Sequence, residues 1–210
     1  MPAGSWAEAF RCVTRDVPGS CMKDPTRRLF VAAAAATAWL TLPTRAAAQD
    51  PRWSAPDGAV ILLRHAIAPG VGDPANFRLG DCSTQRNLDA AGQDQARALG
   101  RRLRADGVNV RRLVSSQWCR TLETAQLAFP AMVVYESPVF NSFFAQQERN
   151  AKQTALAVEE LNRWRGSGVL LVVTHQVNIT ALTGIVPNSG EAVVVKPTDK
   201  GLQVLWRLAP

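Results

Sequence analysis

Two apolar runs, each ending at a histidine, constrain the fold of this chain more than any other feature. Residues 60–63 (Val-Ile-Leu-Leu) lead directly into Arg64 and His65, and residues 169–174 (Val-Leu-Leu-Val-Val-Thr) lead into His175. Continuous apolar runs of this length, bounded by turn residues, are typical of strands buried on both faces of a sheet. Ligands of open α/β sheets bind at the carboxyl ends of the strands. The chain's two histidines are therefore expected at one ligand-binding edge.

Between and after these runs, the sequence alternates between the patterns of helices and strands. Apolar residues at helical spacing predict helices over 90–105, 121–129, about 150–165 and 178–183. Further strands are expected at 112–115, 132–135, 192–195 and 202–208. This alternation indicates an α/β fold, a three-layer sandwich around a mainly parallel central sheet, with the last two strands forming an antiparallel hairpin at one edge.

The N-terminal part of the chain has the composition of an export signal. Arg27 and Arg28 precede an apolar stretch, Leu29–Leu42, and residues 46–48 are alanines that suit a signal cleavage site. Paired arginines before such a stretch are typical of twin-arginine signals. The stretch is shorter than the roughly 20 residues that span a bilayer, which argues against a permanent membrane anchor.

We therefore expect three parts in the chain. Residues 1–21 precede a second methionine, Met22, and are interpreted as a non-native extension. Residues 22–48 are interpreted as the export signal, and residues 49–210 as the mature domain. The twin-arginine export machinery is then a partner during transport, and the destination is the bacterial periplasm or the exterior.

Export changes the charge balance and the interpretation of the cysteines. The net charge of +7 falls to +4 without the leader, because six of the 24 basic and three of the 17 acidic residues precede Gln49. No aromatic residues interleave with the basic cluster around Arg97–Arg112, so nucleic-acid binding is disfavoured.

Cys82 and Cys119 remain after the leader is removed. An even pair in an oxidising compartment predicts a disulfide, and two buried thiols are the alternative.

Four side chains are expected to share the ligand-binding edge: Arg64, His65, Arg120 and His175. Guanidinium groups match the oxygens of phosphate and keep their charge at all relevant pH values. An imidazole beside them can attack phosphorus and form a phosphohistidine that water later cleaves. The arginines would supply the charge that Mg²⁺ supplies elsewhere, so no metal or other cofactor is expected.

Three segments resemble, in order and spacing, the signatures of the histidine phosphatase superfamily, which includes phosphoglycerate mutase. They are Arg64-His65-Ala66, the stretch from Ser115 to Ala125 and the stretch from Val172 to His175; residues 88–96 also resemble the family's segment at the start of its first long helix. The resemblance implies a phosphoglycerate mutase-like fold, a phosphorylated His65, and a phosphoryl group bound by Arg64, Arg120 and His175. The cysteines, the export signal and the short chain look most like the periplasmic branch that includes lipopolysaccharide core heptose-phosphate phosphatases.

This chain departs from the family mainly at the position of the general acid. The mutase branch has a glutamate where this chain offers Asn141, and the acid phosphatase branch has an aspartate where Gln176 stands. Glu148 is the candidate for the acid, with Glu136 and Asp73 as alternatives; each could also be a solvated surface carboxylate. A missing acid would favour substrates with leaving groups of low pKa.

The sequence thus predicts an exported, metal-independent phosphomonoesterase that hydrolyses a small phosphate ester, for example an envelope phosphosugar. A catalytically weak phosphate-binding envelope protein is the alternative from another class. A phosphomutase is less favoured, because an exported protein has little access to glycolytic intermediates.

Overall fold

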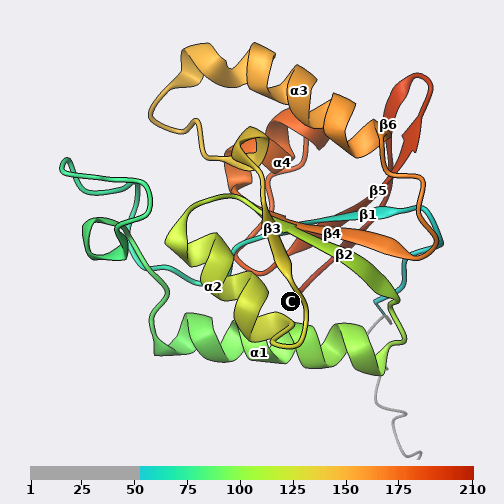
Figure 1. The fold of residues 1–210 in the computed structure, drawn as a ribbon, viewed down its shortest axis with the longest axis horizontal. Helices are drawn as coiled ribbons and strands as arrows, with labels where there is room; N and C mark the ends of the chain where they lie inside the picture. Colours follow the sequence, from blue (N-terminus) through green and yellow to red (C-terminus); the bar gives the residue numbers. More distant parts are fainter. Residues whose placement is uncertain (1–52) are drawn as a thin grey trace, which may run out of the picture. The chain divides into compact units, whose positions relative to one another are not determined.

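The computed structural model describes residues 53–210, so the predicted extension at 1–21 and the predicted export signal at 22–48 lie outside the described residues. The described part is built from a six-stranded sheet with helices on both faces (Figure 1). The strands are β1 (Val60–Arg64), β2 (Val110–Ser115), β3 (Val134–Glu136), β4 (Val169–Thr174), β5 (Ala192–Thr198) and β6 (Gly201–Leu208). The helices are α1 (Ala90–Ala105), α2 (Cys119–Ala128), α3 (Asn150–Asn162) and α4 (Gln176–Thr183), with short 3-10 turns η1 (Cys82–Thr84), η2 (Pro138–Phe140) and η3 (Gln147–Arg149).

The strand order is β3-β2-β4-β1-β5-β6. Strands β3, β2, β4 and β1 pair in parallel, whereas β5 is antiparallel to β1 and to β6. The predicted three-layer α/β sandwich, with a mainly parallel sheet and a hairpin at one edge, is confirmed.

The two faces of the sheet explain why β1 is apolar throughout. Ile61 and Leu63 pack in the cluster that includes residues of α1 and α2, and Val60 and Leu62 pack in the cluster that includes residues of α3 and α4. All four side chains have no exposed surface. Figure 1 shows the same layering, with α1 and α2 below the sheet and α3 and α4 above it.

The element boundaries differ slightly from those predicted. Helix α2 begins at Cys119 rather than at residue 121, and α3 ends at Asn162 rather than near 165. Helix α1 begins at Ala90, where Asp89 caps it by accepting a hydrogen bond from the backbone N–H of Gly92 at 2.8 Å. Across residues 53–210, the structure has no helix with the length and hydrophobicity needed to cross a membrane.

Helices α1 and α2 approach each other closely at Gly100. A Cβ added there would lie 2.0 Å from the carbonyl oxygen of Ala128, so an alanine forces the two helices apart. We expect Gly100→Ala to lower the free energy of unfolding by about 3 kcal/mol, as overpacking does in well-packed cores. Urea denaturation measures this, with Arg101→Ala on the exposed side of α1 as the control. A Gly100→Ala variant as stable as the wild type would contradict the close approach.

Candidate active site

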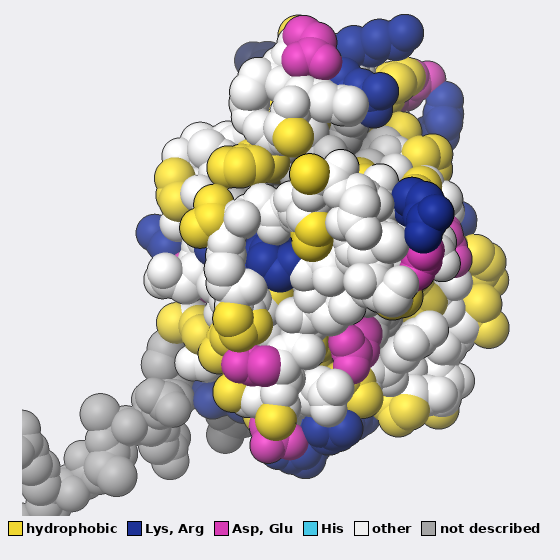
Figure 2. Space-filling model, turned by 90° about the vertical axis from the view of Figure 1, so that its left-hand side faces the viewer, with side chains coloured by type: hydrophobic (Ala, Val, Ile, Leu, Met, Phe, Trp, Pro, Cys, Tyr) yellow, Lys and Arg dark blue, Asp and Glu magenta, His cyan; other side chains and the backbone are white. Residues whose placement is uncertain are grey.

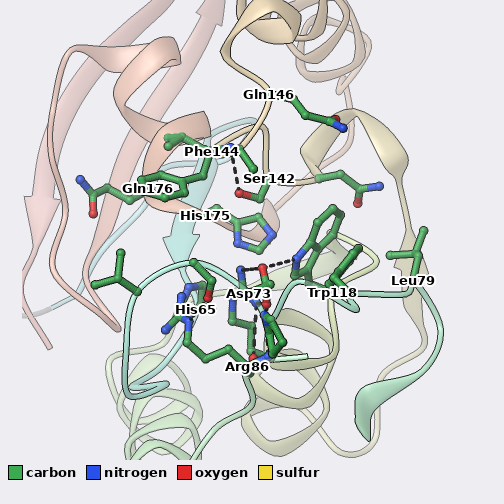
Figure 3. A pocket seen from close by; sticks show the side chains of 18 of the residues that line it. His65, Asp73, Leu79, Arg86, Trp118, Ser142, Phe144, Gln146, His175 and Gln176 are labelled. Carbon is green, nitrogen blue, oxygen red and sulfur yellow. Dashed lines mark hydrogen bonds and ion pairs between the residues drawn. The ribbon is translucent and has the colours of Figure 1, made fainter. Parts of the chain in front are cut away.

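The two histidines meet at the carboxyl edge of the sheet. Strands β1 and β4 are parallel neighbours, and Arg64 is paired with Thr174, so His65 and His175 follow at the same level. The backbone N–H of His65 donates to the carbonyl oxygen of Thr174 at 3.0 Å. The two imidazole centroids are 5.5 Å apart, and each side chain is 3% exposed. Figure 3 shows both rings facing one cavity.

A hydrogen bond at Nδ1 of His65 shows which nitrogen of the ring is free to react. Its Nδ1 lies 2.8 Å from the carbonyl oxygen of Ala66. Because a carbonyl only accepts, Nδ1 carries the proton and Nε2 keeps its lone pair. Burial, and then the charge of Arg120, lowers the pKa of His65 to about 3. The imidazole is therefore neutral and nucleophilic at neutral pH.

His175 is held by a short relay of polar side chains. Its Nε2 lies 2.8 Å from the hydroxyl oxygen of Ser116, and that hydroxyl donates to Oδ1 of Asn141 at 3.2 Å. The Ser116 hydroxyl therefore links the ring of His175 to the side chain of Asn141. Asn141, at the position where the mutase branch has its acid, thus orients His175. Burial first, and then the charge of Arg120, lowers the pKa of His175 well below its usual value.

The lowered pKa values of His65 and His175 predict that neither histidine titrates near pH 6.5 in the folded protein. Unfolded histidines take up protons below that pH and the buried ones do not, so the free energy of unfolding falls as the pH drops from about 6.5 toward 3. Imidazole chemical shifts, followed by NMR from pH 8 to pH 4.5, should stay constant for both residues. A titration near pH 6.5 for His65 would contradict the buried, neutral assignment.

The two predicted arginines contribute unpartnered donors. Arg120, at the start of α2, is 3% exposed, and Arg64 donates through NH1 to the carbonyl oxygen of Pro187 at 2.8 Å. The Nε of each guanidinium is buried and has no hydrogen-bond partner. A buried donor without a partner is destabilising, and a bound anion would satisfy both. All four predicted side chains line the same cavity.

Arg86 is a further arginine of the site that the sequence pattern did not predict. Its Nε donates to the carbonyl oxygen of Gly72 at 2.8 Å and its NH1 donates to that of Ala68, so it ties the loop after β1 together. Its charge contributes to the lowered pKa of both histidines. The loop has no periodic pattern, and nothing in the sequence distinguished this arginine from those on the surface. Only the long connection itself pointed to function.

The structure does not support Glu148 as the general acid. Its side chain is exposed on η3 and does not line the cavity, because η3 turns it toward solvent. Glu136 is also exposed, and its Oε2 accepts from Nε2 of Gln117 at 3.4 Å. Among the described residues, the acidic side chain that lines the cavity is Asp73. Of the three carboxylates considered from the sequence, Asp73 is thus the one that the structure places in the cavity.

The cavity is about 730 Å³, and basic, uncharged polar and apolar side chains all line it. Phe77 stacks on Trp118 with centroids 5.0 Å apart, and Trp118 meets His175 edge to face at 5.4 Å. Phe144, 53% exposed, belongs to the opposite wall. Figure 2 shows basic side chains within a hollow of the surface and hydrophobic ones around it. Within residues 53–210, no group of three or more His, Cys, Asp or Glu side chains is arranged to hold a metal ion.

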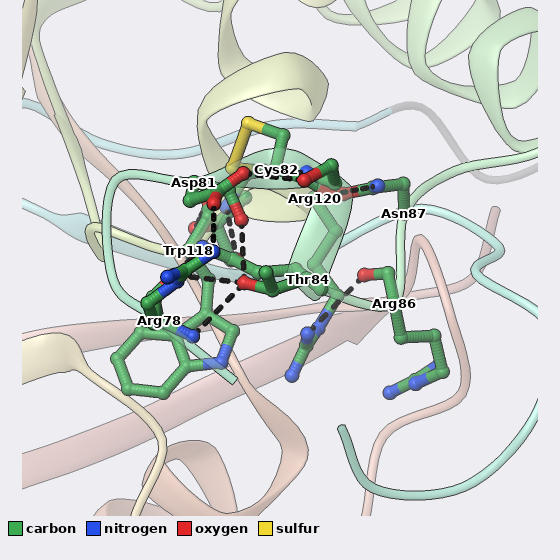
Figure 4. Close-up of a disulfide and its surroundings, with 12 residues drawn as sticks. Arg78, Asp81, Cys82, Thr84, Arg86, Asn87, Trp118 and Arg120 are labelled. Carbon is green, nitrogen blue, oxygen red and sulfur yellow. Dashed lines mark hydrogen bonds and ion pairs between the residues drawn. A yellow bond between two sulfur atoms is a disulfide. The ribbon is translucent and has the colours of Figure 1, made fainter. Parts of the chain in front are cut away.

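The predicted disulfide between Cys82 and Cys119 is present, with an S–S distance of 2.06 Å. It ties the loop after β1 to the first turn of α2, next to Arg120 (Figure 4). Oε1 of Gln85 accepts from the backbone N–H of Cys119 at 3.0 Å, and the carbonyl oxygen of Arg86 accepts from NH1 of Arg120 at 3.3 Å. The crosslink thus supports the loop that carries Arg86 beside the guanidinium of Arg120.

Loss of the disulfide should destabilise the fold. The bond closes a loop with a sequence separation of 37, and chain-entropy arguments give about 3–4 kcal/mol for a loop of this size. We expect a reductant to lower the urea midpoint of the wild type. The double variant Cys82→Ser/Cys119→Ser should have the lower midpoint with or without reductant. Equal midpoints for the oxidised and reduced wild type would contradict this prediction.

The comparisons with known proteins agree with this fold. The fold and the paired histidines define a phosphoglycerate mutase-like α/β domain. Residues 60–139 match the family model of the histidine phosphatase superfamily (branch 1). Together with the fold, this match supports a relationship of residues 60–139 to that superfamily. None of the curated proteins matches the sequence significantly.

Solved structures share the fold at low sequence identity. The protein histidine phosphatase SixA, complexed with tungstate, is 19% identical with a TM-score of 0.50, covering 72% of this chain and 97% of that one. A mycobacterial glucosyl-3-phosphoglycerate phosphatase in complex with VO3 is 15% identical with a TM-score of 0.53, covering 72% and 99%. The phosphoserine phosphatase of Entamoeba histolytica in complex with 3-phosphoglyceric acid is 11% identical with a TM-score of 0.53, covering 72% and 97%.

Proposed function

We propose that this chain is a phosphomonoesterase that hydrolyses a phosphate ester through a phosphohistidine at His65. One observation carries the proposal: a neutral imidazole with a free Nε2 lines a cavity with two guanidinium groups whose buried Nε donors have no partner. The family-model match and the phosphatases among the similar structures support it.

The residues can perform the reaction in two steps. Nε2 of His65 attacks phosphorus, the bond to the leaving oxygen breaks, and that oxygen takes a proton. Arg64 and Arg120 stabilise the charge on the equatorial oxygens of the phosphoryl group, and His175 lines the same cavity beside them. Water then attacks phosphorus, the N–P bond breaks, and its electron pair returns to His65 as inorganic phosphate leaves.

The substrate class we propose is an envelope phosphosugar, as in the heptose-phosphate branch that the sequence resembles. Aromatic walls formed by Phe77 and Trp118 support it, since such rings stack on the apolar faces of sugars. The proposed location is the periplasm or the exterior, supported by the disulfide and by the leader-like residues 22–48. The arginines take the role of a metal, so the proposed reaction is metal-independent.

Activity assays test the proposal. The full chain should hydrolyse a generic aryl phosphate with EDTA present, and it should be faster on at least one phosphosugar than on nucleotides or phosphopeptides. Binding of inorganic phosphate without any turnover would instead favour the phosphate-binding envelope protein. N-terminal sequencing of the protein recovered from the periplasm tests export, and a start at Gln49 is expected.

A further inference from the structure

Asp73 lies in the candidate active site and is held there by strong hydrogen bonds. NH1 of Arg120 donates to its Oδ1 at 2.7 Å, and NH2 of Arg120 donates to its Oδ2 at 3.2 Å. The indole Nε1 of Trp118 donates to Oδ2 at 3.0 Å, and the backbone N–H of Arg86 donates to Oδ1 at 3.2 Å. Figure 3 shows the carboxylate facing the cavity together with His65 and His175.

Arg120 has two edges, and Asp73 uses only one of them. The carboxylate occupies the terminal nitrogens, whereas Nε is buried and has no partner. A phosphoryl oxygen can therefore bind on the Nε side while Asp73 keeps its place on NH1 and NH2. One guanidinium would then hold the phosphoryl group and the carboxyl group side by side.

From this arrangement we propose that Asp73 is the general acid of the site and protonates the leaving oxygen of the substrate. The proposal rests on the proposed phosphatase function. Asp73 is the acidic residue among those that line the cavity. The imidazole Nε2 of His65 is the nucleophile, and its Nδ1–H is bonded to the carbonyl oxygen of Ala66, so His65 has no proton to give to the leaving group.

Substrate binding supplies the condition under which Asp73 becomes protonated. Burial alone would raise the pKa of Asp73, but the hydrogen bonds and charge of Arg120, with the indole of Trp118, outweigh burial and hold this pKa below its usual value. The carboxyl group is thus ionised in the empty site. A phosphoryl dianion that shares Arg120 places negative charge beside the carboxylate, which raises its pKa and favours proton uptake from solvent.

The proton balance of the reaction then closes on one residue. When His65 Nε2 bonds to phosphorus, the P–O bond to the leaving group breaks and the proton of Asp73 passes to the leaving oxygen. In the second step the carboxylate of Asp73 accepts a proton from the attacking water, the N–P bond breaks, and phosphate is released. Asp73 is protonated again at the end of the cycle.

Hydrogen bonds hold the loop around Asp73 in place. Gly70 and Gly72 have φ values of 92° and 70°, in the left-handed region that favours glycine. The carbonyl oxygen of Gly72 accepts a hydrogen bond from Nε of Arg86 at 2.8 Å. Together with this backbone contact, the four hydrogen bonds of its carboxylate aim Asp73 at the cavity.

Leaving-group dependence tests the proposal, because general acid catalysis matters most for poor leaving groups. For Asp73→Asn, kcat/KM should fall about 10²–10³-fold with phenyl phosphate and less than about 10-fold with 2,4-dinitrophenyl phosphate. Its inhibition constant for inorganic phosphate should not rise, since a negative charge near the anion is removed. Asp81→Asn, in the same loop but outside the cavity, is the matched control and should not change the ratio between the two substrates.

Two outcomes would overturn the assignment. Equal losses with both substrates and a higher inhibition constant would show that Asp73 only supports Arg120. A selective loss for phenyl phosphate in Glu148→Gln, with none in Asp73→Asn, would return the role to Glu148. Either outcome leaves the phosphatase function standing, whereas failure of the wild type to hydrolyse both substrates would reject that function itself.

Discussion

Replacing His65 with alanine should lower kcat/KM for an aryl phosphate by on the order of 10⁴-fold or more, because the variant has no nucleophile. In the wild type, the Nδ1–H bond to the carbonyl oxygen of Ala66 leaves Nε2 free in the cavity. No other side chain of the site combines a neutral nucleophilic nitrogen with a supporting backbone acceptor. Steady-state assays of the wild type and the variant measure the effect.

The control for this variant is anion binding. Arg64 and Arg120 are unchanged in His65→Ala, so inorganic phosphate should still bind with an affinity within about 10-fold of the wild type. Substantial turnover by His65→Ala that still binds phosphate would show that the reaction does not pass through His65. Loss of phosphate binding together with activity would instead indicate a disturbed fold.

Replacing Arg120 with alanine should have the second largest effect. It removes the guanidinium that faces the proposed phosphoryl group and leaves Asp73 partly buried without its cation; the side chains of the two residues are 3% and 17% exposed. We expect a loss of about 10³-fold in kcat/KM, in the range seen for arginines that stabilise phosphoryl transfer. Breaking a buried ion pair should also lower the free energy of unfolding by about 3 kcal/mol.

Two further variants separate charge from geometry. Arg120→Lys keeps the positive charge but loses the planar fork, so it should recover part of the stability and little of the activity. Arg112→Ala removes an exposed arginine whose guanidinium lies over the ring of Tyr135, away from the cavity, and should leave kcat/KM unchanged. Full activity in Arg120→Lys would contradict the role of the fork.

The sheet and the meeting of the histidines were predictable from sequence. Buried parallel strands have continuous apolar runs, and a run that ends at a polar residue places it at the carboxyl edge. The apolar runs did not show that β1 and β4 are neighbours in the sheet. The carboxyl ends of two parallel strands in one sheet nevertheless lie at the same ligand-binding edge. The motif around Arg120 likewise identified the start of α2 to within two residues.

The loop after β1 could not be predicted in the same way. Arg86 and Asp73 are placed by contacts with carbonyl oxygens of the loop, with Trp118 and with Arg120, and such contacts leave no periodic signal in the sequence. Glu148 lies near Asn141 in sequence, yet it stands on η3 with its side chain exposed to solvent. Where the backbone is irregular, the position of a residue along the chain does not show which way its side chain points.

In the proposed reaction, His65 carries the phosphoryl group during turnover. Rapid quenching of the wild-type protein with a ³²P-labelled aryl phosphate should trap a label that is lost in acid and that maps to the peptide containing residue 65. The His65→Ala variant should give no label. A label on another residue, or wild-type turnover with no phosphorylated protein under single-turnover conditions, would contradict the claim.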